Sequence, residues 1–113
     1  MKTEQEALAA LTVLCARGEH CSQEMLDKMN RWEVDQTAQA RVMEYLTQHK
    51  YINDERFTRA FINDKIKYNK WGRRKIEQAL WAKRIPWETM NSVLDEIDDS
   101  EYLSVLRSEE HTV

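Results

Sequence analysis

Basic and aromatic side chains gather in the segment YNKWGRRKIEQAL, residues 68–80. Its basic residues surround an aromatic ring and a glycine: Lys70, Trp71, Gly72, Arg73, Arg74 and Lys75. Lysine and arginine bind phosphate and carboxylate groups, and an indole ring can stack on a base or pack against protein. The segment therefore predicts either a surface for an anionic partner or the solvated start of a helix.

The positive charge extends well beyond this segment. From Arg56 to Arg84 the chain has ten Lys or Arg against two acids, a net charge of +8, whereas Glu88 to Val113 carries eight acids against one Arg, a net charge of −7. The overall charge of −3 hides this polarity. Because the charges run across two helices and their junction, we predict a binding surface. Its candidate residues are Arg56, Arg59, Lys65, Lys67, Lys70, Arg73, Arg74, Lys75, Trp81, Lys83 and Arg84.

Two of these positions are unusual for a helix. Arg73 and Arg74 fall in an expected first turn, where positive charge opposes the helix dipole at a cost of a few tenths of a kcal/mol each. Free N–H groups and guanidinium groups at this turn could instead bind a phosphate or a carboxylate cluster. We expect Trp81 to be an interface residue, because the inward positions of its helix are already filled by apolar residues: Ile76, Ala79 and Leu80.

We interpret the other aromatic residues as structural. Trp32 and Trp87 fall at inward or junction positions and are predicted to be core residues. Tyr68 and Trp71 are expected to close the local core at a helix junction, although both could stack on bases or on a partner.

The chain has few groups suited to metal binding or catalysis. Cys15, His20 and Cys21 are adjacent, but a zinc site needs further ligands in paired spacings, and His49 and His111 are isolated. Cys15 falls on an apolar stripe, so we expect a structural thiol and no disulfide.

Paired carboxylates occur at Asp54-Glu55 and Asp98-Asp99, and each pair opens a predicted helix. Acids at that position satisfy backbone N–H groups, so capping explains them without catalysis. Since the chain also has no phosphate-binding loop or nucleophile motif, the sequence predicts neither an enzyme nor a cofactor or small-molecule substrate.

Composition indicates a helical protein. The 113 residues include two glycines and one proline and are dominated by helix formers. No apolar run is long enough to cross a bilayer, and the N-terminus lacks the apolar core of a signal peptide, so we expect no membrane partner and a cytoplasmic location.

Apolar residues recur with helical period through the whole chain. The pattern predicts a helix over about 3–17 that stops at a left-handed Gly18, and a second capped by Ser22. A third follows Asp35, with Tyr45 on its buried stripe. Further helices are expected after Asn53 or Asp54, near Gly72, from Pro86 at its first turn, and from Asp98, the last with Tyr102, Val105 and Leu106 apolar.

These helices repeat. A shift of 51 positions lays SQEMLDKMNRWEVDQTAQARVMEYL on RRKIEQALWAKRIPWETMNSVLDEI and matches six apolar pairs: Met25 with Ile76, Met29 with Leu80, Val34 with Ile85, Val42 with Val93, Met43 with Leu94, and Leu46 with Ile97. The same shift pairs Gly18 with Asn69, two residue types that tolerate left-handed backbone. We predict tandem three-helix repeats over residues 1–52 and 53–97, the second basic, and the first helix of an incomplete third repeat over 98–113.

Over roughly residues 20–107 the chain resembles the RecX family, regulators of the bacterial recombinase RecA, and the segment from Asn53 to Ile85 is the most specific part of the resemblance. The resemblance rests on Asp54-Glu55-Arg56-Phe57-Thr58-Arg59-Ala60-Phe61, Gly72, Lys75-Ile76, Ala79-Leu80 and Lys83-Arg84-Ile85. It implies an elongated, curved helical array that lodges in the groove of a RecA filament on DNA. Family members usually have glycine where this chain has Arg84, so we expect a tighter or differently shaped connection there.

The resemblance implies that the chain inhibits RecA, and thus modulates DNA repair, recombination and the SOS response. The partner would be the RecA filament, and single- or double-stranded DNA within it could also meet the basic segment. Two alternatives remain from the residues alone: a direct nucleic-acid-binding helical module, and a helical scaffold for an unrelated protein.

Overall fold

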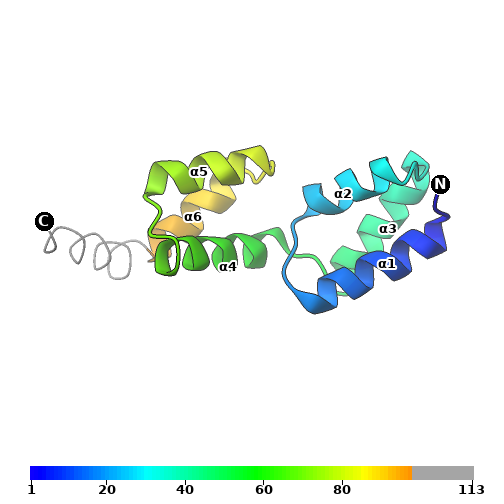
Figure 1. Ribbon diagram of the computed structural model, residues 1–113, viewed down its shortest axis with the longest axis horizontal. Coiled ribbons are helices and arrows are strands. Elements are labelled where there is room, and N and C mark those ends of the chain that lie inside the picture. Colours follow the sequence, from blue (N-terminus) through cyan, green and yellow to red (C-terminus); the bar gives the residue numbers. More distant parts are fainter. Residues whose placement is uncertain (98–113) are drawn as a thin grey trace, which may run out of the picture. The chain divides into compact units, whose positions relative to one another are not determined.

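The computed structural model describes residues 1–97 and is entirely helical in that range (Figure 1). Its helices are α1 (Glu4–Arg17), α2 (Ser22–Arg31), α3 (Gln36–Gln48), α4 (Asp54–Lys67), α5 (Arg73–Ala82) and α6 (Trp87–Ile97). The predicted all-α class is confirmed. The expected seventh helix, with Asp98 and Asp99 at its start, lies outside the described residues. Within the described part, no helix is both long enough and apolar enough to span a bilayer.

The chain divides into a first unit, Met1–Phe57, and a second unit, Thr58–Val113. In the first unit α1 and α2 both pack on α3, and the buried apolar residues are Ala7, Leu11, Cys21, Met25, Met29, Val34, Ala38, Val42, Leu46, Ile52 and Phe57. In the second unit α5 packs on α6, and the buried apolar residues are Ile62, Ile66, Ile76, Leu80, Ile85, Met90, Val93 and Leu94. Each unit therefore has an apolar core of its own.

The same type of turn occurs once in each unit, at positions 51 residues apart. After α2, Glu33 is left-handed with φ of 56°; its N–H donates to the Asn30 carbonyl (3.1 Å), and the next N–H, of Val34, donates to Met29 (3.0 Å). After α5, Arg84 is left-handed with φ of 58° and makes the same two bonds, at 2.9 and 3.1 Å. This pattern is a Schellman motif, in which the residue after the turn packs back on the helix. Arg84 therefore keeps the same turn shape as Glu33.

Helix starts use several kinds of cap. Thr3 and Glu6 form a reciprocal capping box, and the Asp35 carboxylate accepts bonds from two N–H groups of α3. Asn53 caps α4 by accepting from the Arg56 N–H at 2.9 Å. Gly72 precedes α5 and offers no side-chain cap, and the first turn of α5 has no acid. Compared with the other helices whose caps are described, α5 therefore has the N-terminus whose positive dipole end is least neutralised by its cap and first turn.

Four expectations about helix ends were wrong. Gly18 is extended, with φ of 177°, because the chain leaves α1 as a straight link to α2. The left-handed residue after α4 is Lys70 and not Asn69. Ser22 is the first helical residue, and Cys21 holds the cap position with its N–H donating to Glu24 at 2.9 Å. Pro86 likewise lies just before α6, where its carbonyl accepts the Met90 N–H.

The core predictions failed for three aromatic residues. Trp87 is 51% exposed, because it begins α6 and no preceding turn covers it. Tyr68 is 71% exposed beyond the end of α4, and Tyr45 is also exposed, stacking on Tyr51 and His49 at the surface. Trp32 is half-buried against the core of the first unit, as expected of a junction residue.

Candidate binding surface of the second unit

Trp71 joins the end of α4 to the start of α5. The Phe61 ring meets it edge to face, with centroids 6.4 Å apart, and two ammonium groups lie over the indole: Lys65 Nζ at 4.7 Å and Lys75 Nζ at 4.6 Å. Each such cation–π contact contributes about 0.5–1 kcal/mol at an exposed site. Trp71 is half-buried, as predicted for a residue that closes the local core. It also brings two positive charges together over one ring.

Arg73 connects α5 to α6. Its Nη2 donates to Asn91 Oδ1 at 2.8 Å and lies 3.7 Å from the Asp95 carboxylate, while its Nε lies 3.5 Å from Glu77. These contacts offset the unfavourable position of an arginine in a first helical turn. Arg73 therefore has a structural role that the sequence did not reveal.

The two arginines of α4 are also bound within the chain. In the first unit, Arg56 pairs with Glu19 (Nε to Oε2, 2.5 Å) and donates to the carbonyls of Lys50 and Tyr51 at 3.0 and 3.2 Å. In the second unit, Arg59 forms an ion pair with Glu96. Contacts within the chain therefore occupy part of the hydrogen-bonding and charge-pairing capacity of both arginines.

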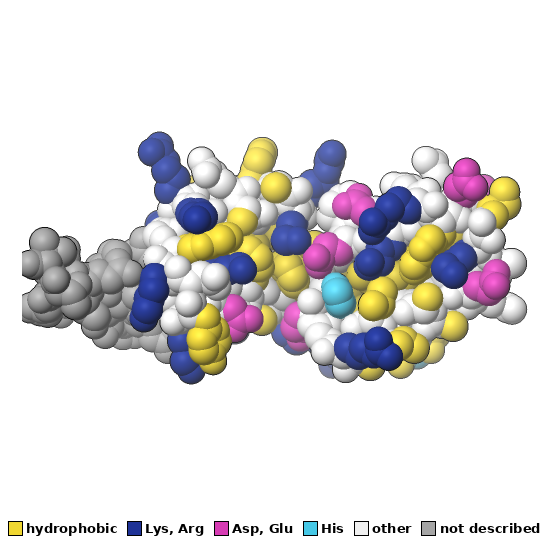
Figure 2. Space-filling model, in the orientation of Figure 1, with side chains coloured by type: hydrophobic (Ala, Val, Ile, Leu, Met, Phe, Trp, Pro, Cys, Tyr) yellow, Lys and Arg dark blue, Asp and Glu magenta, His cyan; other side chains and the backbone are white. Residues whose placement is uncertain are grey.

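Most of the remaining basic residues are exposed to solvent. Lys67 lies over the Tyr68 ring at 5.3 Å, and Lys83 is half-buried. Lys70, Arg74 and Arg84 are exposed and form no ion pair among the described residues. Figure 2 shows Lys and Arg side chains projecting from the second unit with exposed hydrophobic side chains among them. We call Lys70, Arg74 and Lys75, next to the start of α5, the basic cluster.

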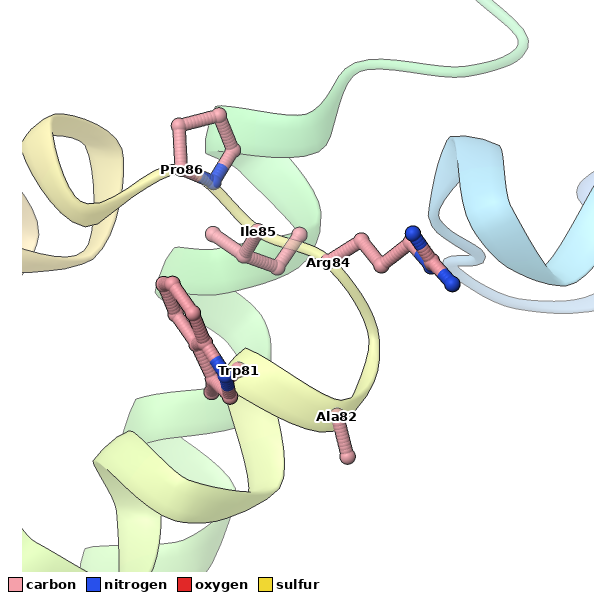
Figure 3. Close-up of a pocket in the computed structure, with 5 residues that line it drawn as sticks. All are labelled: Trp81, Ala82, Arg84, Ile85 and Pro86. Carbon is pink, nitrogen blue, oxygen red and sulfur yellow. The ribbon is translucent and has the colours of Figure 1, made fainter.

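Trp81 is 68% exposed and borders two hollows. One hollow, of about 280 Å³, lies between α5 and α6 and is lined by Glu77, Gln78, Trp81, Trp87 and Met90. The other is lined by Trp81, Ala82, Arg84, Ile85 and Pro86 (Figure 3). The sequence singled out Trp81 and Arg84 but missed Trp87 and Met90. The repeat could have identified them, because a shift of 51 aligns these two apolar residues with the polar residues Gln36 and Gln39.

The cysteine segment shows no sign of reactivity. Cys15 and Cys21 are both free thiols, and burial raises the pKa of Cys21 to about 11. Burial also raises the pKa of Cys15, with the Glu19 carboxylate adding to the effect. Neither thiol is therefore activated as a nucleophile. Over residues 1–97, no three His, Cys, Asp or Glu side chains gather as metal ligands would.

Comparison with known proteins identifies the family. Residues 53–94 match the sequence model described as "RecX, second three-helix domain". The chain is 30% identical over 80 residues to Regulatory protein RecX of Lactobacillus gasseri, 28% over 94 residues to that of Clostridioides difficile, and 31% over 99 residues to that of Clostridium tetani. These alignments cover 71%, 82% and 77% of the chain but 30%, 43% and 45% of the relatives.

The fold agrees with the family. A crystal structure of regulatory protein RecX superposes with a TM-score of 0.81 at 13% identity, covering 90% of this chain and 51% of that one. The chain spans less than half the length of the curated relatives it matches. By sequence it belongs to the RecX family.

Proposed function

From its membership of the RecX family, we propose that this chain binds the RecA filament on DNA and inhibits the recombinase and its ATP hydrolysis, thereby modulating recombination, DNA repair and the SOS response. The observation that carries the proposal is the basic cluster of the second unit, which lies within the residues that match the family model. Such a chain acts in the bacterial cytoplasm, where the filament forms. It works by occupancy and needs neither catalysis nor a cofactor of its own.

The basic cluster supports this function by its place as well as its charge. Lys70, Arg74 and Lys75 surround the uncapped start of α5, where the helix dipole adds to their positive potential. Filaments of a protein on DNA present phosphate groups and protein carboxylates in regular arrays, and fixed cations bind both. A chain that bridges neighbouring protomers opposes the rearrangements that ATP turnover and strand exchange require.

The test is RecA-dependent ATP hydrolysis on single-stranded DNA, titrated with the native chain and a Lys70→Glu/Arg74→Glu variant. Both residues are exposed without ion pairs in the described part of the chain, so the fold should tolerate the change. A matched control is Arg17→Glu/Arg31→Glu, which makes the same charge change on exposed residues of the first unit. We expect inhibition by the native chain and the control, and much weaker inhibition by the variant. Native protein that does not inhibit would refute the proposal.

Direct binding to nucleic acid is the second candidate, and the basic cluster favours it too. It predicts binding to bare single- or double-stranded DNA whose affinity falls steeply with salt, by one power of salt for roughly each phosphate contacted. Equal affinity for bare DNA and for the filament would support this candidate over the first.

A further inference from the structure

The two units differ at the surface where α5 meets α6. At the equivalent place in the first unit, the Gln39 amide donates to Asn30 Oδ1 and to the Val34 carbonyl, both at 2.9 Å, and closes the surface between α2 and α3 with polar groups. In the second unit the positions of Asn30, Gln36 and Gln39 hold Trp81, Trp87 and Met90. Polar residues thus suffice for this fold at those positions.

The aromatic residues of the second unit are costly to expose. Trp81 is 68% and Trp87 51% exposed, while Met90, 1% exposed, lies beneath them at the hollow between α5 and α6. Large apolar side chains left in water are a mark of interaction sites, and tryptophan is enriched among residues that dominate binding energy. Since the same turn occurs in the first unit and its helices begin at equivalent positions without them, we attribute the two tryptophans to binding and not to folding.

The charges beside Trp81 indicate which kind of partner would bind in the hollows. Glu77 lines the hollow between α5 and α6, and Glu88 lies in the first turn of α6, so a phosphate group would meet carboxylates there. On the other side, the exposed Arg84 lines the second hollow, and Figure 3 shows Ile85 between its guanidinium and the Trp81 indole. An apolar group suits the first hollow and a carboxylate suits Arg84. This combination fits a protein segment better than a nucleic acid.

We propose that the Trp81–Trp87 groove, lined by Glu77, Gln78, Trp81, Trp87 and Met90, binds an apolar side chain from a segment of a RecA subunit, with Arg84 pairing to one carboxylate of that segment. The proposal rests on the proposed function and assigns a protein contact to this part of the surface. The basic cluster at the start of α5 is a separate part, available to phosphate.

The test replaces the groove with the residues of the first unit. Trp81→Asn/Trp87→Gln/Met90→Gln copies the Asn30, Gln36 and Gln39 arrangement, so it should remain helical, as circular dichroism can check. Tyr68→Asn is the control, because Tyr68 is 71% exposed in the same unit but lines neither hollow. Affinity for RecA filaments on immobilised single-stranded DNA, and for that DNA alone, is measured for each protein. If the triple variant does not fold, Trp81→Asn alone supplies the measurement.

We expect the groove variant to bind the filament at least tenfold more weakly while its affinity for bare DNA is unchanged, and the control to bind like the native chain. A variant that keeps native affinity for the filament would overturn the groove but leave the proposed function standing. Loss of bare-DNA binding would show that the tryptophans stack on bases, and an equal loss in Tyr68→Asn would show a general surface effect; either overturns the inference. A native chain that does not bind the filament overturns both.

Discussion

Replacing Arg84 with glycine should stabilise the second unit while weakening its binding. Arg84 has φ of 58°, and left-handed backbone costs a non-glycine residue about 1–2 kcal/mol. Glycine removes that cost but adds freedom to the unfolded chain, which costs about 0.5–1 kcal/mol. The exposed arginine side chain makes no ion pair in the described part of the molecule, so little else is lost. The net gain in unfolding free energy is therefore about 0–1.5 kcal/mol.

Urea unfolding followed by tryptophan fluorescence measures this gain. Three of the four tryptophans, Trp71, Trp81 and Trp87, lie in the second unit and report on it. Glu33→Gly is the matched control, because Glu33 occupies the same turn of the first unit with φ of 56°. It should stabilise its own unit by a similar amount without changing affinity for the filament. Arg84→Lys keeps both charge and strain and should change stability little.

Binding of the same variants completes the test. Because Arg84→Gly removes an exposed positive charge from a residue that lines the hollow beside Trp81, we expect weaker binding to RecA filaments from a more stable protein. Opposite signs cannot arise from general loss of structure. A decrease in stability would refute the assignment of strain to this turn, and unchanged affinity would remove Arg84 from the binding surface.

Three further predictions concern stability. Because burial raises the pKa of Cys21 to about 11, this thiol should leave the unfolding free energy of the first unit unchanged below about pH 9. Its ionisation should lower that free energy by about 3 kcal/mol as pH rises through 11, and Cys21→Ala should remove this contribution in urea unfolding at increasing pH. Gln39→Leu should cost about 1–3 kcal/mol in unfolding free energy by leaving Asn30 and the Val34 carbonyl without their donor, whereas Gln23→Ala on α2, which removes a solvent-exposed bond to Asp27, should cost far less. Arg73→Gln should destabilise the second unit by about 1 kcal/mol through lost contacts to Asn91 and Asp95, while Arg74→Gln should leave melting unchanged and weaken filament binding.

Periodicity and turn chemistry predicted the helices well. The stripes that place Met25, Met29 and Val42 inside hold in the structure, and so do their partners at a shift of 51, Ile76, Leu80 and Val93. Such positions are predictable because a helix buries every third or fourth residue whatever its partner. The left-handed turns were not predicted at Glu33 and Arg84, because residue type gives no warning where a Schellman motif accepts a charged residue.

The binding surface was only partly predictable. Sequence gave the charge of the second unit and the exposure of Trp81, but Arg73 reaches Asn91 across 18 positions, a contact that no local pattern contains. Trp87 was wrongly predicted to be buried, because a helical stripe does not show that the first residue of a helix lacks a preceding turn to cover it. Both errors concern tertiary surroundings and not local structure.

The comparison between units separates what folding requires from what binding requires. Both units keep apolar residues at equivalent core positions and the same turn, so the demands of packing are met in each. Their surfaces differ: residues 1–57 carry seven basic against ten acidic residues, and residues 58–97 carry nine against five. In the second unit, which is the positively charged one, Trp81 and Trp87 stand at the positions that Asn30 and Gln36 occupy in the first unit. Because charge and exposed apolar surface change together at positions the fold leaves free, the second unit is where a partner is expected to bind.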